Sequence, residues 1–442
     1  MGYIQGEARG QHTLFPSTLE ELIPADHVCR VIEAFVGKLK MDELGFVRAE
    51  AAETGRPGYD PRDLLKLYLY GYLHQVRSSR RLEAECRRNV EVMWLLGRLA
   101  PDYKSIAEFR RMHREALSGA CAELVRLARR VGLVRGEWVA IDGSKFRAVA
   151  SAGAVREREA VKRYLDELQD ADEQDGVVID ASAVAAALEQ LKNDPEPEAH
   201  FMRMARANPA PAYNVQTAVD AEHGIIIAHE VTTEAADNRS LLPMAKAAKA
   251  ALDHPQELKV VADAGYSNGE QAAECEQQGI MPHVPANRAV NNQGDGTLLD
   301  RSLFIYDEKT DTFRCPADKT LLRKQVHKKD RCVMYVAPIG VCNKCPLKPR
   351  CTKTSRRWIT RHLHEGALQR MTARATAQAM RLRRCTVERP FALLKYVIFG
   401  HPRFLLRGLS GAQTEIGLAT LAYNLKTMMN VLGKTELAAA LA

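Results

Sequence analysis

Three acidic residues that are far apart in the sequence have surroundings suited to metal-dependent chemistry. Asp142 lies in "VAIDG" and Asp263 in "VVADAG", so each follows apolar residues and is followed closely by glycine. Glu388 lies in the basic stretch "RRCTVERPFALLKY". Carboxylates that are brought together repel each other unless a cation neutralises them. The three acids are therefore candidate ligands of Mg²⁺ or Mn²⁺.

A site of this kind can carry out phosphoryl transfer. Hard oxygen ligands, few in number, leave the ion open positions for water and a substrate phosphate. With a third acid, two ions about 3.5–4 Å apart can clamp the attacking and leaving oxygens. The alternative is structural, because aspartates at the ends of strands often cap the next helix or make a turn.

Helix geometry groups Glu388 with basic residues. At 100° per residue, Arg381, Arg384, Glu388 and Lys395 fall within an arc of about 60°, so one continuous helix would present them as a stripe. Pro390 interrupts this pattern, because a proline inside a helix removes a hydrogen bond. We expect either a kink there or a helix that starts near Thr386.

Charge is unevenly distributed along the chain. The net charge is +8, but residues 301–410 carry 25 Lys and Arg against 7 Asp and Glu, whereas residues 151–200 carry 5 against 13. A basic block of this size repels itself unless it binds a polyanion, most often nucleic acid. A merely solvated basic surface is the alternative interpretation.

The first 135 residues have the pattern of a helical domain. Leucine and tyrosine are dense over residues 59–76, and Pro61 suits the first turn of a helix. Two further helices are expected over 77–97 and 105–133. The polar side of the first of these carries Arg80, Arg81, Arg87 and Arg88. Such helices suit a DNA-binding module, although exposed arginines are also common on helices that bind nothing.

The spacing of apolar residues changes near residue 137. It predicts a strand in "EWVAIDGSKFRAVAS" that ends at Asp-Gly and a hairpin in "AYNVQTAVDAEHGIIIAHEVTT". A strand and a helix are expected in "LKVVADAGYSNGEQAAECEQQG", and a further strand in "IMPHVP". We therefore expect an α/β sheet with an antiparallel part, in which the strands of Asp142 and Asp263 lie side by side.

Four of the ten cysteines, Cys315, Cys342, Cys345 and Cys351, form the pattern C-x26-C-x2-C-x5-C. The close pair has the half-site spacing of tetrahedral Zn²⁺. An iron–sulfur cluster uses the same ligands, unligated thiols are the structural alternative, and His327 and Cys332 are substitute ligands. The segment lacks the apolar periodicity to hold itself together, which favours a metal. The remaining cysteines are expected in the core: Cys29, Cys86, Cys121, Cys275 and Cys385.

The three acids and their neighbours resemble the DDE motif of bacterial insertion-sequence transposases, in a branch with the signature Tyr-x2-Arg-x3-Glu-x6-Lys. Arg384, Glu388 and Lys395 match that spacing, and Arg381 stands at the tyrosine position. The segment "GRPGYDPRDLLKLYLYGYLHQVRSSRRLEAECRRN" is similar to the helical DNA-binding domain of that family. Further similar segments are "YNVQTAVD" and "RFLLRGLSGAQTEIGLATLAYNLK".

The resemblance implies an RNase H-like fold and cut-and-paste or related DNA strand transfer. Water and then a DNA 3′-hydroxyl would attack phosphodiesters in line. Asp142, Asp263 and Glu388 would bind two Mg²⁺ or Mn²⁺ ions. Residues that would contact DNA phosphates are Arg384, Lys395, Arg381 and Arg389. Double-stranded DNA is the expected partner, and a homo-oligomer the expected assembly.

Two other functions stay open. One is a transposase-derived DNA-binding protein that lacks catalysis, in which the acids serve as turn and cap residues. The other is an RNase H-like nuclease that cuts DNA without joining it. A strand-transfer reaction with pre-cleaved ends separates the nuclease from a transposase.

These patterns predict four segments of the chain. They are a helical DNA-binding domain over 1–135, the first part of the catalytic domain over 136–285 with a helical acidic insertion at 151–210, a basic Cys-rich insert over 286–362, and a helical part of the catalytic domain over 363–442 that carries Glu388. No run of 18 apolar residues and no leader pattern occurs in the sequence, so we expect a cytoplasmic, nucleoid-associated protein without a membrane anchor.

Overall fold

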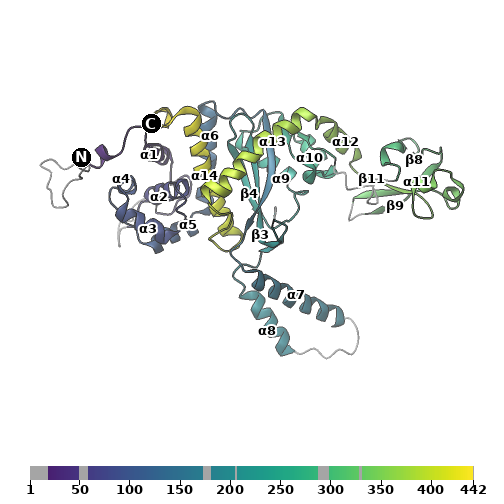
Figure 1. Ribbon diagram of the computed structural model, residues 1–442, viewed down its shortest axis with the longest axis horizontal. Helices are drawn as coiled ribbons and strands as arrows, with labels where there is room; N and C mark the ends of the chain where they lie inside the picture. Colours follow the sequence, from purple (N-terminus) through teal and green to yellow (C-terminus); the bar gives the residue numbers. More distant parts are fainter. Residues whose placement is uncertain are drawn as a thin grey trace, which may run out of the picture. The chain divides into compact units, whose positions relative to one another are not determined.

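The computed structural model describes residues 18–48, 58–172, 181–204, 207–286, 298–327 and 331–441. It contains many helices and two β-sheets, and a helical region occupies the N-terminal part (Figure 1), so the predicted α/β class is confirmed. Within these ranges no helix is long and apolar enough to span a membrane. The predicted start of the first domain and the first residues of the predicted insert lie outside the described residues.

The chain divides into two compact units. The first comprises residues 1–133, 145–213 and 390–442, and the second comprises residues 134–144 and 214–389.

The first unit is mostly helical. Helix α2 (Pro61–Leu73) begins as predicted, because the Asp60 carboxylate accepts the backbone N–H of Arg62 and Pro61 occupies the first turn. The long helix α14 (Gly408–Leu432) packs against α2 and α6 and buries most of its side chains. Other helices of this unit include η1 (Glu20–Leu22), α1 (Val28–Lys38), α3 (Ser79–Arg88), α4 (Val90–Leu95), α5 (Tyr103–Met112), α6 (Arg114–Arg130) and α15 (Lys434–Leu441).

The two N-terminal helices predicted over 77–97 and 105–133 are each broken once. At Asn89 the backbone is extended and the side chain caps α4 by accepting the N–H of Glu91 at 3.0 Å. At His113 the ring Nε2 accepts the N–H of Val47 at 2.9 Å, and Nδ1 donates to the Phe109 carbonyl at 2.8 Å. A local cap at Asn89 and a long-range hydrogen bond at His113 therefore override the helical period.

The larger sheet has the strand order β2-β3-β1-β5-β6, with β4 paired to β3. Its strands are β1 (Trp138–Arg147), β2 (His200–Met202), β3 (Ala210–Asp220), β4 (Ile226–Thr232), β5 (Leu258–Val261) and β6 (Ile280–His283). Strands β3 and β4 form the predicted antiparallel hairpin, and β5 is parallel to both β1 and β6. The predicted adjacency of the strands that lead to Asp142 and Asp263 is therefore confirmed.

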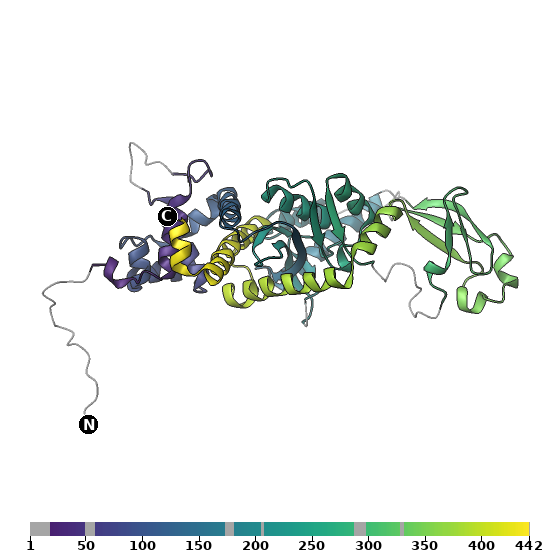
Figure 2. The same cartoon turned by 90° about the horizontal axis from the view of Figure 1, so that it is seen from above.

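Helices cover this sheet on both faces (Figure 2). Helix α9 (Leu241–Ala251) packs on β4, and α10 (Gly269–Gln277) packs on β6 and on α12 (Glu365–Arg374). On the other face, Ala379 and Val387 of α13 (Ala377–Ala392) form a buried cluster with Ala140 and Val261 of the two central strands. This apolar contact fixes α13 above the strands that carry the aspartates.

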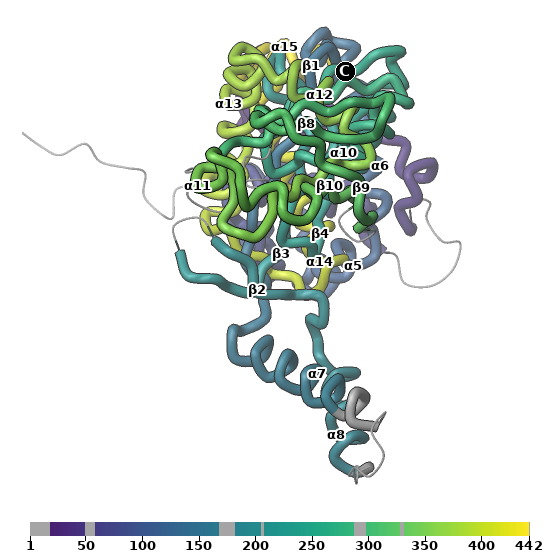
Figure 3. The backbone as a smooth tube through the Cα atoms, turned by 90° about the vertical axis from the view of Figure 1, so that its right-hand side faces the viewer, coloured from purple at the N-terminus to yellow at the C-terminus, as the bar shows by residue number. Residues whose placement is uncertain are grey.

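The acidic segment forms two helices, α7 (Ala152–Asp172) and α8 (Ala181–Lys192), as predicted. They run side by side in Figures 1 and 3. Their base is fixed by Arg158, which is nearly buried and donates to the Asp194 carboxylate at 3.0 Å and to the Glu196 carbonyl at 2.7 Å. Arg158 thus joins the start of α7 to the chain that follows α8.

The Cys-rich segment folds as a five-stranded antiparallel sheet with the order β11-β10-β9-β8-β7. Its elements are η4 (Arg301–Leu303), β7 (Ile305–Asp307), β8 (Thr312–Arg314), β9 (Thr320–His327), β10 (Cys332–Val336), η5 (Val341–Lys344), α11 (Lys348–Cys351) and β11 (Trp358–His362). Phe313, Leu321, Tyr335 and Ile359 lie in a buried cluster. The expectation that this segment lacks the apolar pattern to hold itself together is therefore wrong, since short alternating strands supply its core.

Candidate active site

The structure brings together Asp142, within β1, and Asp263, two residues after the parallel strand β5. Strands β1 and β5 pair Ala140 with Val261, and continuing this register by two residues sets Asp142 opposite Asp263. Arg383 of α13 bridges them: its Nη2 donates to Asp142 Oδ1 at 2.8 Å and to Asp263 Oδ2 at 3.3 Å. Two carboxylates that share one cationic nitrogen form an arrangement that also suits a metal ion.

Asp142 does not end its strand, contrary to the sequence prediction. Strand β1 continues to Arg147, because Gly143 allows close packing at this point. A Cβ on Gly143 would lie 2.3 Å from Nε2 of Gln216 and 2.7 Å from Oδ1 of Asp237. Only glycine fits there without displacing those side chains.

Electrostatics distinguish the two aspartates. Burial raises the pKa of Asp142 to about 6, the guanidinium of Arg383 opposes this rise, and the charge of Asp263 adds to it. The side chain of Asp142 is 20% exposed and that of Asp263 is 47% exposed. Asp142 is therefore the carboxylate whose ionised form gains most from a cation.

A layer of buried polar side chains beside the aspartates was missed by sequence reasoning. Asn214 and Gln216 of β3 both donate to Oδ1 of Asp237 at 2.7 Å. The hydroxyl of Tyr266, in η2 (Ala264–Tyr266), donates to Oε1 of Gln216. Burial raises the pKa of Tyr266, and the charges of Asp237, Asp142 and Asp263 raise it further. The two amides at alternate positions of an apolar strand were the signal available in the sequence.

Glu388 is on α13 but does not join this cluster. Its side chain is exposed and makes no hydrogen bond or ion pair with another described residue. It follows Arg383 by five residues, which turns a regular α-helix by about 140°. Arg383 faces the aspartates, and Arg381, Arg384 and Arg389 are exposed like Glu388. The role of Glu388 therefore stays a prediction.

The helix does not start near Thr386, which was one of the two predicted arrangements around Pro390. Helix α13 begins at Ala377 and continues through Pro390 to Ala392, where the π-helix η6 (Leu393–Ile398) follows. Arg381, Arg384 and Glu388 therefore share one helix. Lys395 belongs to η6 in the other compact unit, where its ammonium lies 5.4 Å from the centre of the Phe146 ring.

The predicted N-terminal DNA contacts all lie on α3 and are exposed. Arg87 pairs with Glu83 at 3.1 Å, Arg88 pairs with Glu85, and Arg80 lies over the Tyr103 ring at 5.2 Å. Ion pairs at the protein surface are weak, so they leave Arg87 and Arg88 available to phosphates. The arginines of α3 form one basic helix surface.

The four clustered cysteines surround a small cavity of about 30 Å³. Backbone N–H groups point at two of their sulfurs, from Lys319 to Cys315 at 3.3 Å and from Arg357 to Cys342 at 3.4 Å. Burial raises the pKa of Cys351, which the Arg357 charge opposes. Thiolates are common ligands of Zn²⁺, and a metal at these four cysteines stays a prediction. All ten cysteines are free, and Cys385 is exposed rather than in the core.

In the part of the chain that the structure describes, a tighter group of metal-type donors is His27, Cys29 and Glu91, whose donor atoms lie within 4.8 Å of one another. His27 Nδ1 accepts the N–H of Cys29, so its Nε2 carries the proton and lies 3.4 Å from Glu91. Glu91 also accepts the Tyr70 hydroxyl at 2.6 Å. This geometry is that of a hydrogen-bond network and not of a metal site.

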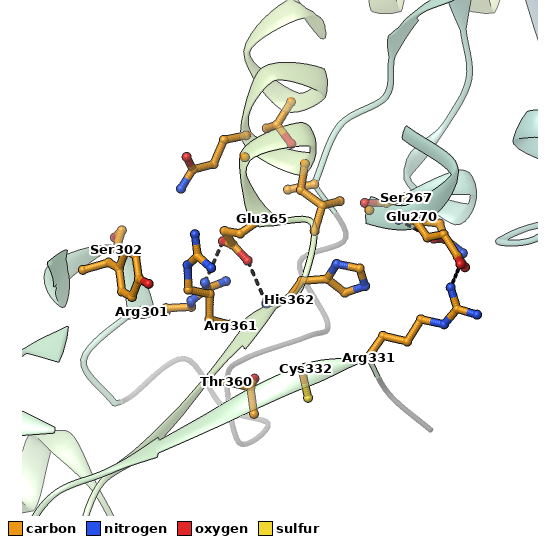
Figure 4. Close-up of a pocket in the computed structure, with 18 of the residues that line it drawn as sticks. Ser267, Glu270, Arg301, Ser302, Arg331, Cys332, Thr360, Arg361, His362 and Glu365 are labelled. Atoms are coloured by element: carbon orange, nitrogen blue, oxygen red, sulfur yellow. Dashed lines mark hydrogen bonds and ion pairs between the residues drawn. The ribbon is translucent and has the colours of Figure 1, made fainter. Parts of the chain in front are cut away.

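A cleft of about 2070 Å³ is lined by residues that follow Asp237 and Asp263 in the sequence, among them Asn238 and Asn268. Asn268 donates to the Asn238 carbonyl at 2.9 Å. Figure 4 shows two ion pairs across its lining, Arg301 with Glu365 at 2.6 Å and Arg331 with Glu270. Internal pairing neutralises much of its charge.

Comparisons with known proteins identify the family. Residues 17–112 match the family model described as a transposase domain (DUF772), and residues 171–425 match the one described as a transposase DDE domain. No curated protein matches the chain. Among solved structures, the piggyBac transposase in a synaptic complex with hairpin DNA is 9% identical over 94% of this chain and 77% of its own, with a TM-score of 0.35. That likeness is too weak to carry an argument.

The DDE-domain match spans more than half of the chain, which therefore belongs to the DDE transposases. It is accordingly a DNA-cleaving enzyme with an RNase H-like fold, and DNA is its partner. Enzymes of this family use divalent metal ions. Asp263 and Glu388 lie inside the matched segment and Asp142 outside it, so the case for Asp142 rests on the geometry above.

Proposed function

We propose that this transposase cleaves DNA at the ends of an insertion sequence and joins the freed 3′ ends to target DNA in a reaction that depends on Mg²⁺ or Mn²⁺. The observation that carries the proposal is the pair of aspartates on neighbouring parallel strands, both hydrogen-bonded to Arg383. Carboxylates held this close are stable when a cation neutralises them.

Asp142, Asp263 and Glu388 are the proposed ligands. Two divalent ions, when bound, would stabilise charge on the attacking and leaving oxygens. Asp142 is held by strand pairing and Asp263 by the N–H of Gly265, which donates to its Oδ1 at 2.8 Å. These contacts fix both carboxyl groups before DNA arrives, which lowers the cost of assembling the site. No residue needs to form a covalent bond to DNA.

Basic residues are the proposed contacts to the DNA backbone. Arg80 and Arg81, with Arg87 and Arg88, form the basic surface of α3, which we assign to DNA phosphates. Near the cleavage point the contacts would come from Arg384, Arg381, Arg389 and Lys395. Arginine suits this role because its guanidinium donates two parallel hydrogen bonds to one phosphate.

The four predicted segments remain our proposal for how these tasks are divided. Residues 1–135 would bind DNA, 136–285 and 363–442 would form the catalytic domain, and 286–362 would form a zinc-binding insert. Zn²⁺ is proposed at Cys315, Cys342, Cys345 and Cys351, because four sulfurs line one small cavity and backbone N–H groups donate to two of them. A homo-oligomer on paired DNA ends completes the proposal.

Cleavage of DNA that carries the element ends tests the function. Asp142→Asn and Asp263→Asn are expected to lower cleavage by about 10³-fold or more while DNA binding stays within a few-fold of wild type. Glu274→Gln, a change of an acid on α10 away from the site, is the matched control. Wild-type cleavage by Asp142→Asn would reject the proposal.

One observation favours a second function. The Arg383 bridge already neutralises Asp142 and Asp263, as expected of a DNA-binding protein whose aspartates are structural. In that case purified wild-type protein binds the element ends but shows no cleavage with either Mg²⁺ or Mn²⁺. A second reaction supplies DNA with pre-cleaved ends. A transposase joins these ends to target DNA, whereas a nuclease does not.

A further inference from the structure

Asp237 is an acid next to the site to which the sequence assigns no role. It lies between β4 and α9, and its Oδ1 accepts hydrogen bonds at 2.7 Å from both Asn214 and Gln216. Those two amides are fully buried on β3. Their hydrogen bonds hold the carboxylate in one orientation.

Two glycines show how close this carboxylate lies to the other aspartates. A Cβ on Gly143, the residue after Asp142, would lie 2.7 Å from Oδ1 of Asp237. A Cβ on Gly265 would lie 2.9 Å from Oδ1 of Asp263 and 4.0 Å from Oδ2 of Asp237. The two oxygens of Asp237 therefore lie beside backbone that adjoins each of the two aspartates.

An independent observation points to a ligand at this place. The side-chain Oδ1 of Asn214 is buried and has no hydrogen-bond partner among the described residues. It would lie 3.1 Å from a Cβ on Gly143, next to Asp237 Oδ1. A buried oxygen without a donor calls for a cation or a water molecule. The neighbouring carboxylates favour a cation.

We propose that Asp237 is a further metal ligand of the active site, and that its carboxylate, with Asp142, Asp263 and the Asn214 side-chain oxygen, supplies oxygen ligands to divalent ions. The inference rests on the proposed function. An all-oxygen set of carboxylates and an amide carbonyl suits Mg²⁺ and Mn²⁺. Asp237 lies beside the backbone of Gly143 and Gly265, which adjoins both aspartates, whereas Glu388 is exposed on α13.

The test measures Mn²⁺ binding to the full-length protein without DNA, by titration of the electron paramagnetic resonance signal of free Mn²⁺. Asp237→Asn keeps one oxygen that can accept both amide N–H groups, so its metal-free melting temperature is expected to stay near wild type. Its Mn²⁺ affinity is expected to fall by about tenfold or more, as is that of Asp142→Asn. Glu234→Gln, in the same loop, is the matched control and is expected to bind Mn²⁺ like wild type.

The outcomes separate this inference from the proposed function. If Asp142→Asn loses Mn²⁺ binding and Asp237→Asn does not, Asp237 is a structural residue and the inference fails alone. If Asp142→Asn binds Mn²⁺ like wild type, the proposed function fails with it. If Glu388→Gln loses Mn²⁺ binding and Asp237→Asn does not, Glu388 is the third ligand and the inference is overturned.

A second variant covers the case in which Asp237→Asn does not fold. In Asp237→Cys a thiolate replaces the carboxylate, and thiolates bind Mn²⁺ better than Mg²⁺. The ratio of DNA cleavage in Mn²⁺ to cleavage in Mg²⁺ is expected to rise by about tenfold or more over the wild-type ratio. An unchanged ratio in Asp237→Cys would show that residue 237 does not contact the ion.

Discussion

At the scale of single residues, Arg383 is the main constraint on the site. Its guanidinium, 17% exposed, lies where it neutralises Asp142 and Asp263 together. A divalent ion that binds the same carboxylates would also neutralise their charge. Arg383 and the ion are therefore expected to substitute for each other in stabilising the folded protein.

The change Arg383→Gln tests this substitution. Without metal the variant is expected to lose about 1–3 kcal/mol of unfolding free energy, because two neighbouring carboxylates are left without their cation. Saturating Mn²⁺ is expected to raise its melting temperature more than that of wild type. Arg384→Gln, an exposed neighbour on the same helix, is the control in these DNA-free melts. Equal Mn²⁺ shifts in Arg383→Gln and wild type would contradict the argument.

Residue-scale prediction from the sequence was only partly successful, for physical reasons. The adjacency of Asp142 and Asp263 was predictable, because parallel strands place equivalent ends side by side. Asp237 was not predictable, since it lies in a loop without periodicity and depends on a partner strand. Glu388 was grouped with basic residues from helical spacing, which does not show which side of the helix faces the sheet. Packing of Ala379 and Val387 on the sheet decides which side of α13 faces the aspartates.

At the scale of elements, α10 and α12 are joined by one acid and two arginines. Glu276 accepts hydrogen bonds from Arg370 at 2.6 Å and from Arg374 at 2.7 Å. The hydrogen bond from Arg370, followed by that from Arg374, lowers the pKa of Glu276 below its usual range. The contact ties two helices that cover the catalytic sheet.

This contact predicts a pH-dependent difference in stability. A carboxylate whose pKa is lowered by folding stabilises the protein fully above its ordinary pKa of 4.5 and loses that contribution as the pH falls through the lower folded value. Glu276→Gln is expected to lower the free energy of unfolding by about 1 kcal/mol at pH 7. This difference from wild type is expected to disappear in acid. Urea melts across this pH range measure it, with Glu274→Gln as the control. A gap that stays constant with pH would contradict the assignment.

The Cys-rich insert combines an apolar core with a candidate metal site. Because Phe313 and Tyr335 lie in a core of its own, loss of metal is expected to disorder the cysteine loops without unfolding the strands. Hydrogen exchange after treatment with a zinc-selective chelator measures this.

Metal analysis of purified protein complements the exchange experiment on the insert. One Zn²⁺ per wild-type chain is expected, with a lower content in Cys345→Ser and an unchanged content in Cys385→Ser, whose thiol lies outside the cluster. A metal-free and fully ordered wild-type insert would refute the zinc proposal.

At the scale of the whole molecule, the family is shown by the DDE-domain match, whereas the metal site is a proposal. The DDE-domain match covers residues 171–425, whereas Asp142 precedes it and is placed by strand register and by the hydrogen bond from Arg383. The change in apolar periodicity near residue 137 predicted the change from helices to strands, and β1 begins at Trp138. It did not predict the breaks at Asn89, where the side chain caps the next helix, and at His113, where the ring binds the distant Val47 backbone.

The central claim is that Asp142 and Asp263 form a divalent-metal site, and locating Mn²⁺ in crystals of the full-length protein by anomalous scattering tests it most directly. The account predicts Mn²⁺ bound to the carboxylates of both aspartates, with Arg383 displaced from at least one of them. Asp237 is expected among the ligands. The opposite result would be crystals at saturating Mn²⁺ in which no ion binds these carboxylates and Arg383 still bridges both aspartates. That result would show that the two aspartates do not form a metal site.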